Sequence, residues 1–396
     1  MKTMKKLFPT YEVGSLPKLA ARVKALQGQL LTVQDLQEVE HYGQKYSELA
    51  PAVELLQHYH REHHQLLPNE KVLLVDANAL LNLRILESYD LDYVYDGEAR
   101  RSEMYRHMAA QIQGFENYPE MLRSRGPDSW QASICAKEPR LKYKLEELPI
   151  LKEFAFVEQH ALSNIKVPLD DPYMIANMTG NKHYLEQLRP DYTSPQRLRY
   201  EAKRSLTLAL AHKVIRPNVE VLAKLGALWI QLDIPAATLD PRHIPIMVEG
   251  INAVVEGIPD VKFSLHLCYP RRVSLTEKKG YDLLFPAILN LDENVNHLSL
   301  ELANGNEYEK DLRIFAASSR RFEIGLGVVD ITLEKQQQGV METADEIRLR
   351  ILKAAQLLGP EQIYVAPDCG LRQLSLERAC RLLETLAAGT EIARKG

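Results

Sequence analysis

Short apolar runs of strand length alternate along this chain with longer amphipathic patterns, and this alternation constrains the fold more strongly than any other feature. Strands that alternate with helices form parallel sheets, because each helix carries the chain back to the start of the next strand. Eight apolar runs can be counted, ending near Ser15, Glu98, Asp170, Asp233, Cys268, Glu301, Asp330 and Asp368. The sequence therefore predicts an α/β fold with a closed (β/α)8 barrel, the TIM barrel, whose chemistry lies where the strands end.

Two stretches of the chain are additional to the strands and helices of a minimal barrel. Residues near 27–90 have mostly helical patterns, and residues near 126–163 contain the β-rich run 150–157, which predicts a hairpin at the mouth of the barrel. No Gly/Ser-rich or Pro-rich linker isolates either stretch. We therefore expect residues 1–396 to form a single TIM-barrel domain with a helical and a hairpin insertion.

Composition excludes several classes of function. The chain is 45% hydrophobic with a formal net charge of -4, which suits a large core and provides no basic face for nucleic acid. Phe8 and Pro9 follow the basic start where a secretory signal needs an unbroken apolar stretch, and no apolar run is long enough to span a membrane. Four cysteines are too few for a disulfide framework. We therefore expect a cytoplasmic protein that binds neither nucleic acid nor a membrane.

His266 and Cys268 lie two positions apart at the end of a predicted strand, residues 262–270. Side chains two apart on a strand point to the same face, so the imidazole and the thiol converge. Such a pair suits zinc best among the common divalent ions. For an isolated pair, the alternative is a core histidine beside a buried cysteine.

Two further strand ends supply more ligands of the same kind. Cys369 follows the apolar run 362–367, and Glu301 ends the run 296–300, so a His/Cys/Glu/Cys tetrahedron would be complete. The histidine-rich segment 57–64 has no such context. It lies in a long polar helical pattern, and we interpret it as a solvated helix face.

Other strand ends carry groups that suit an amino acid. Val13-Gly14-Ser15 closes the first strand with a glycine, which lets backbone N–H groups approach a small anion, although a plain turn glycine is the alternative. Glu98 ends the second strand and Asp233 the fourth. Two carboxylates at the mouth would suit a substrate ammonium group.

These segments resemble the catalytic half of the cobalamin-independent methionine synthases, from residues 13–15 to 367–370. The His-x-Cys strand and the Pro-Asp-Cys-Gly turn are the most specific parts. Members of that family are zinc enzymes built on a barrel, and the resemblance implies four zinc ligands here: His266, Cys268, Glu301 and Cys369. It also implies that Val13-Gly14-Ser15 holds the carboxylate of homocysteine and that Glu98 and Asp233 hold its amino group. At Asp233 the match is partial, because the family usually has an acid where Ile234 stands.

The thiol-rich ligand set favours activation of a thiol. A free thiol, with a pKa of about 8.5, is mostly protonated at neutral pH, whereas zinc deprotonates a bound thiol and leaves a sulfur lone pair for attack. Hydrolytic zinc sites more often use histidine and carboxylate. We therefore predict a zinc methyltransferase that converts homocysteine to methionine, and we assign no catalytic acid or base from the sequence.

Departures from the family bear on the methyl donor. The amino-terminal barrel that assists the folate donor is absent, and residues 170–176 lack the tryptophan on which the family stacks the pterin. Thr332 stands where the family has a histidine that protonates the leaving folate nitrogen, although Asp330 would serve if its pKa were raised. Methyl transfer from a corrinoid needs no proton. The sequence therefore predicts a methylated corrinoid protein or methylcobalamin as the donor, in an enzyme that resembles single-barrel core methionine synthases.

Three alternatives stay open at this point. One is a methionine synthase that uses methyl-folate, and another is a different zinc-activated thiol alkyltransferase, such as an epoxyalkane:coenzyme M transferase. The third is a metal-free barrel kept as a binding or scaffold protein, which requires four matched ligands to be incidental.

Overall fold

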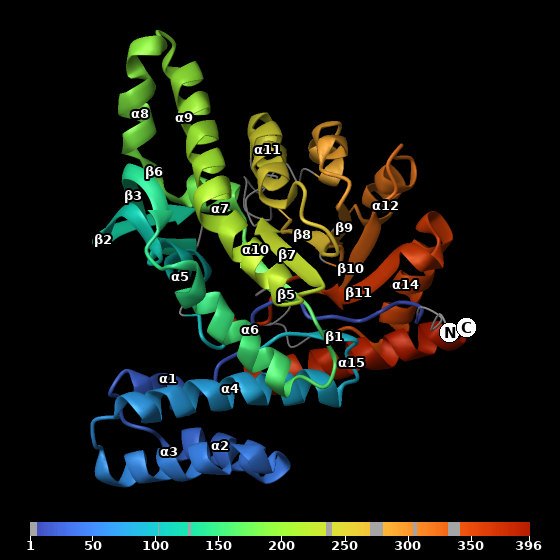
Figure 1. Ribbon diagram of the computed structural model, residues 1–396. Helices are drawn as coiled ribbons and strands as arrows, with labels where there is room; N and C mark the ends of the chain where they lie inside the picture. Colours follow the sequence, from blue (N-terminus) through green and yellow to red (C-terminus); the bar gives the residue numbers. More distant parts are fainter. Residues whose placement is uncertain are drawn as a thin grey trace.

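The computed structural model describes residues 6–101, 103–125, 128–234, 240–269, 280–303, 307–331 and 341–396. Six parallel strands form the main sheet, in the spatial order β11-β10-β9-β8-β7-β5 (Figure 1). Their bounds are β5 (Val167–Asp170), β7 (Trp229–Ile234), β8 (Lys262–Leu267), β9 (Val295–Leu300), β10 (Glu323–Val329) and β11 (Ile363–Pro367).

Backbone pairings outside this sheet join its two edges. The short strands β1 (Tyr93–Val94) and β4 (Asn164–Ile165) pair in parallel, and β4 leads into β5 one residue later. At the other edge Thr10 pairs with Val365 of β11, and the next residue, Tyr11, pairs with Tyr93 of β1. These pairings place residues 10–11, β1 and β4 between β11 and β5, and the predicted α/β fold of the TIM-barrel type is confirmed.

Helices follow the strands around the outside of this barrel (Figure 1). They are α7 (Pro172–Met178), α8 (Lys182–Leu188), α9 (Pro195–Leu210), a π-helical turn Ala211–Ile215, α10 (Arg216–Lys224), α11 (Ile244–Val255), α12 (Tyr308–Ala316), α14 (Ala344–Leu358) and α15 (Leu376–Lys395). Local signals in the sequence set where they begin. The Thr343 hydroxyl accepts a hydrogen bond from the backbone N–H of Glu346, whose carboxylate accepts from Thr343 in return, so a capping box opens α14.

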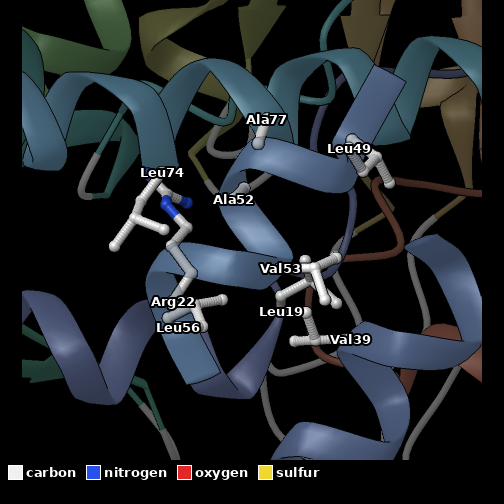
Figure 2. A pocket seen from close by; sticks show the side chains of 9 residues that line it. All are labelled: Leu19, Arg22, Val39, Leu49, Ala52, Val53, Leu56, Leu74 and Ala77. Atoms are coloured by element: carbon white, nitrogen blue, oxygen red, sulfur yellow. The ribbon is translucent and has the colours of Figure 1, made fainter. Parts of the chain in front are cut away.

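The predicted helical insertion lies against one end of the barrel (Figure 1). It consists of α2 (Val33–Lys45), α3 (Ala50–Glu62) and α4 (Pro68–Ser88), and α1 (Ala20–Leu26) precedes it and packs against all three. Figure 2 shows a small cavity among these helices, lined by Leu19, Arg22, Val39, Leu49, Ala52, Val53, Leu56, Leu74 and Ala77. Its volume of about 10 Å³ is that of a single water-sized sphere, so it is a packing void and no ligand site.

The prediction of a hairpin over residues 150–157 is wrong. These residues lie in a helix, α6 (Pro149–His160), because Ile150, Phe154 and Val157 recur at helical spacing and bury one face. A hairpin does form, but earlier in the chain. Its strands β2 (Ile112–Arg125) and β3 (Asp128–Leu141) are antiparallel, β6 (Gly180–Asn181) extends them, and the short helix α5 (Met104–Ala109) precedes them.

Aromatic side chains fill the barrel at the end where its strands begin. Trp229 opens β7, and its ring lies 5.4 Å from that of Tyr11 and 5.5 Å from that of Tyr364, between ring centroids. The ammonium group of Lys262, which opens β8, lies 4.2 Å from the Trp229 ring. This end of the barrel is therefore filled by side chains, and we expect the functional site at the opposite end, where the strands finish. Within the described ranges, no helix combines the length and apolarity that crossing a membrane requires.

Candidate metal centre and substrate site

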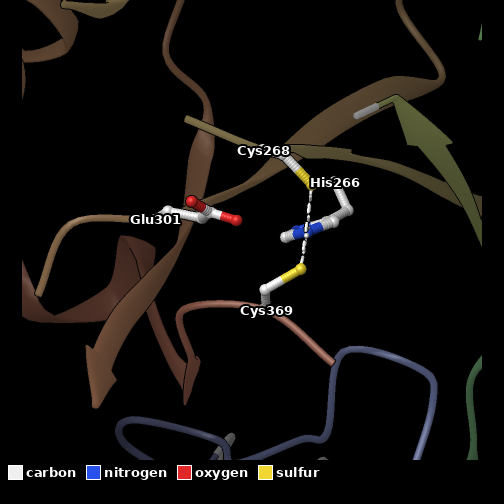
Figure 3. A group of neighbouring side chains, drawn as sticks. All are labelled: His266, Cys268, Glu301 and Cys369. Carbon is white, nitrogen blue, oxygen red and sulfur yellow. Dashed lines mark hydrogen bonds between the residues drawn. The ribbon is translucent and has the colours of Figure 1, made fainter. Parts of the chain in front are cut away.

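The four predicted metal ligands come from three strand ends (Figure 3). His266 is the penultimate residue of β8 and Cys268 comes directly after that strand, Glu301 follows β9, and Cys369 lies two residues after β11. Because parallel strands finish at the same edge of a barrel, these ends meet although the residues lie far apart in the chain.

The ligand atoms are close enough to share one ion. The Nε2 atom of His266 lies 3.3 Å from the sulfur of Cys268 and 3.4 Å from that of Cys369, and the two sulfurs are 3.7 Å apart. With a carboxylate oxygen of Glu301, the four atoms lie within 4.8 Å of one another. A tetrahedral zinc ion with Zn–S bonds of about 2.3 Å would hold two sulfurs about 3.8 Å apart. The donor set thus fits zinc in both chemistry and spacing.

Electrostatics also favour a cation here. The hydrogen bond between the two thiols, together with burial, holds the pKa of Cys268 well above its usual range. Without a cation the Cys268 thiol therefore keeps its proton, and a bound metal would displace that proton.

Neighbouring side chains orient these ligands. The Nδ1 atom of His266 lies 3.4 Å from the hydroxyl oxygen of Ser299, which also accepts a 2.7 Å hydrogen bond from Tyr11. This contact leaves Nε2 facing the thiols, as a metal ligand requires. One oxygen of Asp368 accepts from the backbone N–H groups of Leu302 and Ala303, which fixes the turn after Glu301.

The turn Val13-Gly14-Ser15 lies between Glu98 and the loop that carries Cys369. A Cβ atom on Gly14 would lie 3.1 Å from a carboxylate oxygen of Glu98, so glycine permits this close approach. On the other side, the carbonyl oxygen of Ser15 accepts a 2.7 Å hydrogen bond from the backbone of Leu371. The structure therefore brings the turn that is predicted to bind the substrate carboxylate next to Glu98, which is predicted to bind the substrate ammonium group, and next to the loop that carries Cys369.

Glu98 has a strained backbone and a fixed side chain. Its φ of 55° is in the left-handed region, which costs a non-glycine residue of order 1–3 kcal/mol and persists where neighbours impose it. Its N–H donates to Asp96, and its carboxylate lies 3.3 Å from the guanidinium of Arg101. Arg101 is itself held by Glu153, at 2.6 Å, and by the carbonyl oxygen of Pro168, at 2.8 Å.

Asp233 lies beside His266, its register partner on the neighbouring strand, so both side chains point to the same face. Burial first, and then the nearby charge of Glu98, raise the pKa of Asp233 to about 7. Glu12 has both oxygens buried without a hydrogen-bond partner in the described part of the chain, and burial raises its pKa to about 8. Carboxylates therefore outnumber cations in this region, which suits a positively charged group of a substrate.

Two residues that our sequence analysis missed connect these elements. The ammonium group of Lys166 donates to the carbonyl oxygen of Val13 at 2.8 Å and to the side-chain oxygen of Gln231 at 3.0 Å. The amide group of Gln231 donates to the same Val13 carbonyl at 2.6 Å and to Asp233 at 2.7 Å. The available signal was a charged or polar side chain inside an otherwise apolar strand run.

Taken together, fold and site define a TIM barrel with a candidate thiol-rich metal centre beside buried carboxylates. Comparison with known proteins shows which family within this class the chain resembles. Residues 190–391 match the family described as "Cobalamin-independent synthase, Catalytic domain". A methionine synthase from Pyrococcus abyssi is 34% identical over 326 residues, covering 82% of this chain and 84% of the relative. One from Thermococcus kodakarensis is 32% identical, covering 79% of this chain and 81% of the relative.

A solved structure agrees in fold. It is a B12-independent methionine synthase from Shewanella sp. W3-18-1 in complex with selenomethionine, with a TM-score of 0.72, 19% sequence identity and 98% coverage of both chains. The chain belongs to the cobalamin-independent methionine synthase family, whose members are methyltransferases.

This membership overturns one prediction. The expectation that a methylated corrinoid protein or methylcobalamin donates the methyl group is wrong, because the family is cobalamin-independent. Methyl-folate, given above as an alternative, fits the family better. The prediction rested on departures from the family's pattern, such as Thr332 in place of a histidine and the lack of a tryptophan in residues 170–176, and these departures do not identify the donor. Thr332 lies outside the described residues, and Asp330, which follows β10 and is 7% exposed, provides a carboxyl at that strand end.

Proposed function

We propose that this protein transfers a methyl group from methyl-folate to the thiol of homocysteine, forming methionine, with zinc as its metal. The observation that carries this proposal is the group His266, Cys268, Glu301 and Cys369, whose ligand atoms lie within 4.8 Å of one another in a chain of this family. Zinc suits that mixture of sulfur, imidazole and carboxylate better than the harder divalent ions do. When bound, zinc would hold the homocysteine sulfur as a thiolate at neutral pH.

The protein's own residues would hold the rest of the amino acid. Glu98 and Asp233 are the proposed partners of the ammonium group, and the turn Val13-Gly14-Ser15 is the proposed partner of the carboxylate. Lys166 and Gln231 support this assignment, because both bind the Val13 carbonyl and thereby fix the turn. Correct positioning of this kind brings the sulfur to the methyl group and removes much of the entropic barrier.

The leaving folate nitrogen needs a proton. Asp330 is the proposed source, because it follows β10 at the same end of the barrel as the metal ligands and is 7% exposed. A positioned acid of this kind typically contributes about 10² to 10⁴ in rate.

The activity is proposed for one domain in a reducing compartment. Within the described residues, one large cluster of buried apolar side chains includes Val39 of α2 and Leu56 of α3 together with Leu232 of β7, beside a small second cluster around Trp229. The four cysteines are free, and thiols of this kind persist in the cytoplasm.

The test is methionine formation by the zinc-loaded protein. We expect methionine from homocysteine and methyl-folate, none from methylcobalamin, and none from the metal-free protein. The Asp330→Asn variant should lower kcat while homocysteine binding, measured by calorimetry, stays unchanged. A protein that binds zinc and homocysteine but makes no methionine from methyl-folate would contradict the proposal.

A further inference from the structure

Tyr281 connects two of the strand ends that carry candidate metal ligands, although it is not one of the four ligands itself. It opens the 3₁₀ helix Tyr281–Leu284 and is fully buried. Its hydroxyl donates a 2.8 Å hydrogen bond to the carbonyl oxygen of Leu267 and accepts a 2.9 Å hydrogen bond from the backbone N–H of Glu301. Leu267 stands between His266 and Cys268, so this single hydroxyl touches the backbone next to three ligands.

The hydroxyl lies where the ladder between β8 and β9 stops. The last paired residues are Leu267 and Leu300, so the Leu267 carbonyl and the Glu301 amide lie at the end of this ladder. Buried backbone groups of this kind require a partner. The hydroxyl is that partner for both, and it therefore fixes how far apart the two strand ends lie.

Packing holds Tyr281 in this position. Its backbone N–H donates to Asp311 at 3.0 Å, and its ring centroid lies 5.3 Å from that of Tyr269 and 6.3 Å from that of Phe315. The hydroxyl is thus placed by buried, packed neighbours. A ligand set whose backbone is held in this way is preorganised for its ion.

We infer that Tyr281 is a positioning residue of the metal centre, which sets the spacing between the His266 and Cys268 end of β8 and the Glu301 end of β9. This inference rests on the metal centre proposed above. Without the hydroxyl, the Leu267 carbonyl and the Glu301 amide lose their shared partner and the two ends shift to find others. In the metal-free protein, the four ligand atoms then lie further from the arrangement that zinc requires.

The chain offers a matched control. The hydroxyl of Tyr269 has no hydrogen-bond partner among the described residues, and its ring is buried against that of Tyr281. Tyr281→Phe and Tyr269→Phe therefore remove the same atom from neighbouring rings, one with two backbone contacts and one with none. Both variants keep the ring volume and the packing of the core.

The experiment is a zinc titration of the metal-free proteins against a chromophoric chelator, with circular dichroism as the check of folding. We expect a zinc Kd about 10- to 100-fold higher for Tyr281→Phe, the usual range for residues that orient metal ligands, and no change for Tyr269→Phe. Cobalt substitution adds a readout of geometry, because an altered ligand arrangement changes the cobalt absorption bands. Equal Kd values and equal spectra for the two variants would overturn the inference.

A second variant covers the case in which Tyr281→Phe does not fold. Asp311→Ala keeps the hydroxyl and removes the anchor of the Tyr281 backbone, so a smaller loss of zinc affinity is expected. Unchanged zinc affinity in Asp311→Ala would then count against the inference. If the unmodified protein bound no zinc, the proposed metal centre would be wrong. If it bound zinc tightly but Tyr281→Phe bound zinc equally well, only the role of Tyr281 would be wrong, so the two failures can be told apart.

Discussion

Homocysteine binding should depend on pH through Asp233. A carboxylate can pair with the substrate ammonium group only when it is ionised. Burial and the neighbouring charge of Glu98 raise the pKa of Asp233 to about 7, so this group titrates near neutrality rather than near pH 4. Its ionised fraction, and with it the affinity for homocysteine, should fall as the pH drops below 7.

The size of the effect follows from that pKa. With a pKa of about 7, Asp233 is roughly nine-tenths ionised at pH 8 and roughly one-tenth ionised at pH 6. If only the ionised form binds, the apparent Kd for homocysteine should rise by about tenfold between these pH values. Asp233→Asn removes the charge and should weaken binding at pH 8 by about 1.5–3 kcal/mol, or about 10- to 150-fold.

The assay is calorimetry with the zinc-loaded protein between pH 6 and pH 8. Deprotonation of the bound thiol and titration of Glu12 contribute to both proteins, so the informative quantity is the difference between the unmodified protein and Asp233→Asn. Glu98→Gln gives an independent check. It removes a charge that raises the pKa of Asp233, so the midpoint should move to lower pH. The reasoning is refuted if Asp233→Asn keeps the full tenfold pH dependence.

Three further predictions concern stability. Although burial raises the pKa of Asp92, hydrogen bonds from Lys6 and Thr10 lower that pKa below its usual value. The ionised carboxylate therefore stabilises the fold above the usual aspartate pKa, and this stabilisation is lost as the pH falls through the pKa of the folded state. Asp92→Asn should cost about 1.5–3 kcal/mol at pH 7 but little in acid, as measured by urea unfolding. Gly325→Ala would place a Cβ atom against the hydroxyl of Tyr11 inside the barrel, and we expect a loss of about 1–3 kcal/mol or more in the same assay, with an unchanged midpoint counting against this packing. Arg101→Leu should cost about 3–5 kcal/mol, because it leaves buried carboxylates without their partner, and the double change with Glu153→Leu should recover part of that loss.

The barrel could be predicted because each of its parts has a local signal. Parallel strands buried on both sides are rich in apolar residues, and polar residues such as Asp233 and Glu301 stand at or next to their ends. The same regularity predicts that strand ends meet at one edge, which is why the His266, Cys268, Glu301 and Cys369 group was accessible from the sequence. The run 150–157 was misinterpreted because β-branched and aromatic residues also occur in helices, and here the spacing of the buried residues decided the outcome.

The supporting contacts could not be predicted because they join residues far apart in the chain through geometry alone. Lys166 meets the carbonyl oxygen of Val13, and Tyr281 meets the backbone of Glu301, in contacts that no local pattern encodes. The left-handed backbone of Glu98 is similar, since glutamate has no intrinsic preference for it and its surroundings impose it. The methyl donor depended on family membership, because departures from the family's pattern at a few positions do not identify a substrate.

The central claim is that the strand ends of this barrel hold one zinc ion through two thiolates, and metal content tests it most directly. Zinc should be measured by mass spectrometry of the purified protein after dialysis, for the unmodified chain and for Cys268→Ser, Cys369→Ser and Cys380→Ser. Cys380 lies on α15 and is not one of the grouped ligands, so its variant is the control. We predict one zinc per chain in the unmodified protein and in Cys380→Ser, and a large loss in the other two. Full zinc occupancy in both Cys268→Ser and Cys369→Ser would contradict the account.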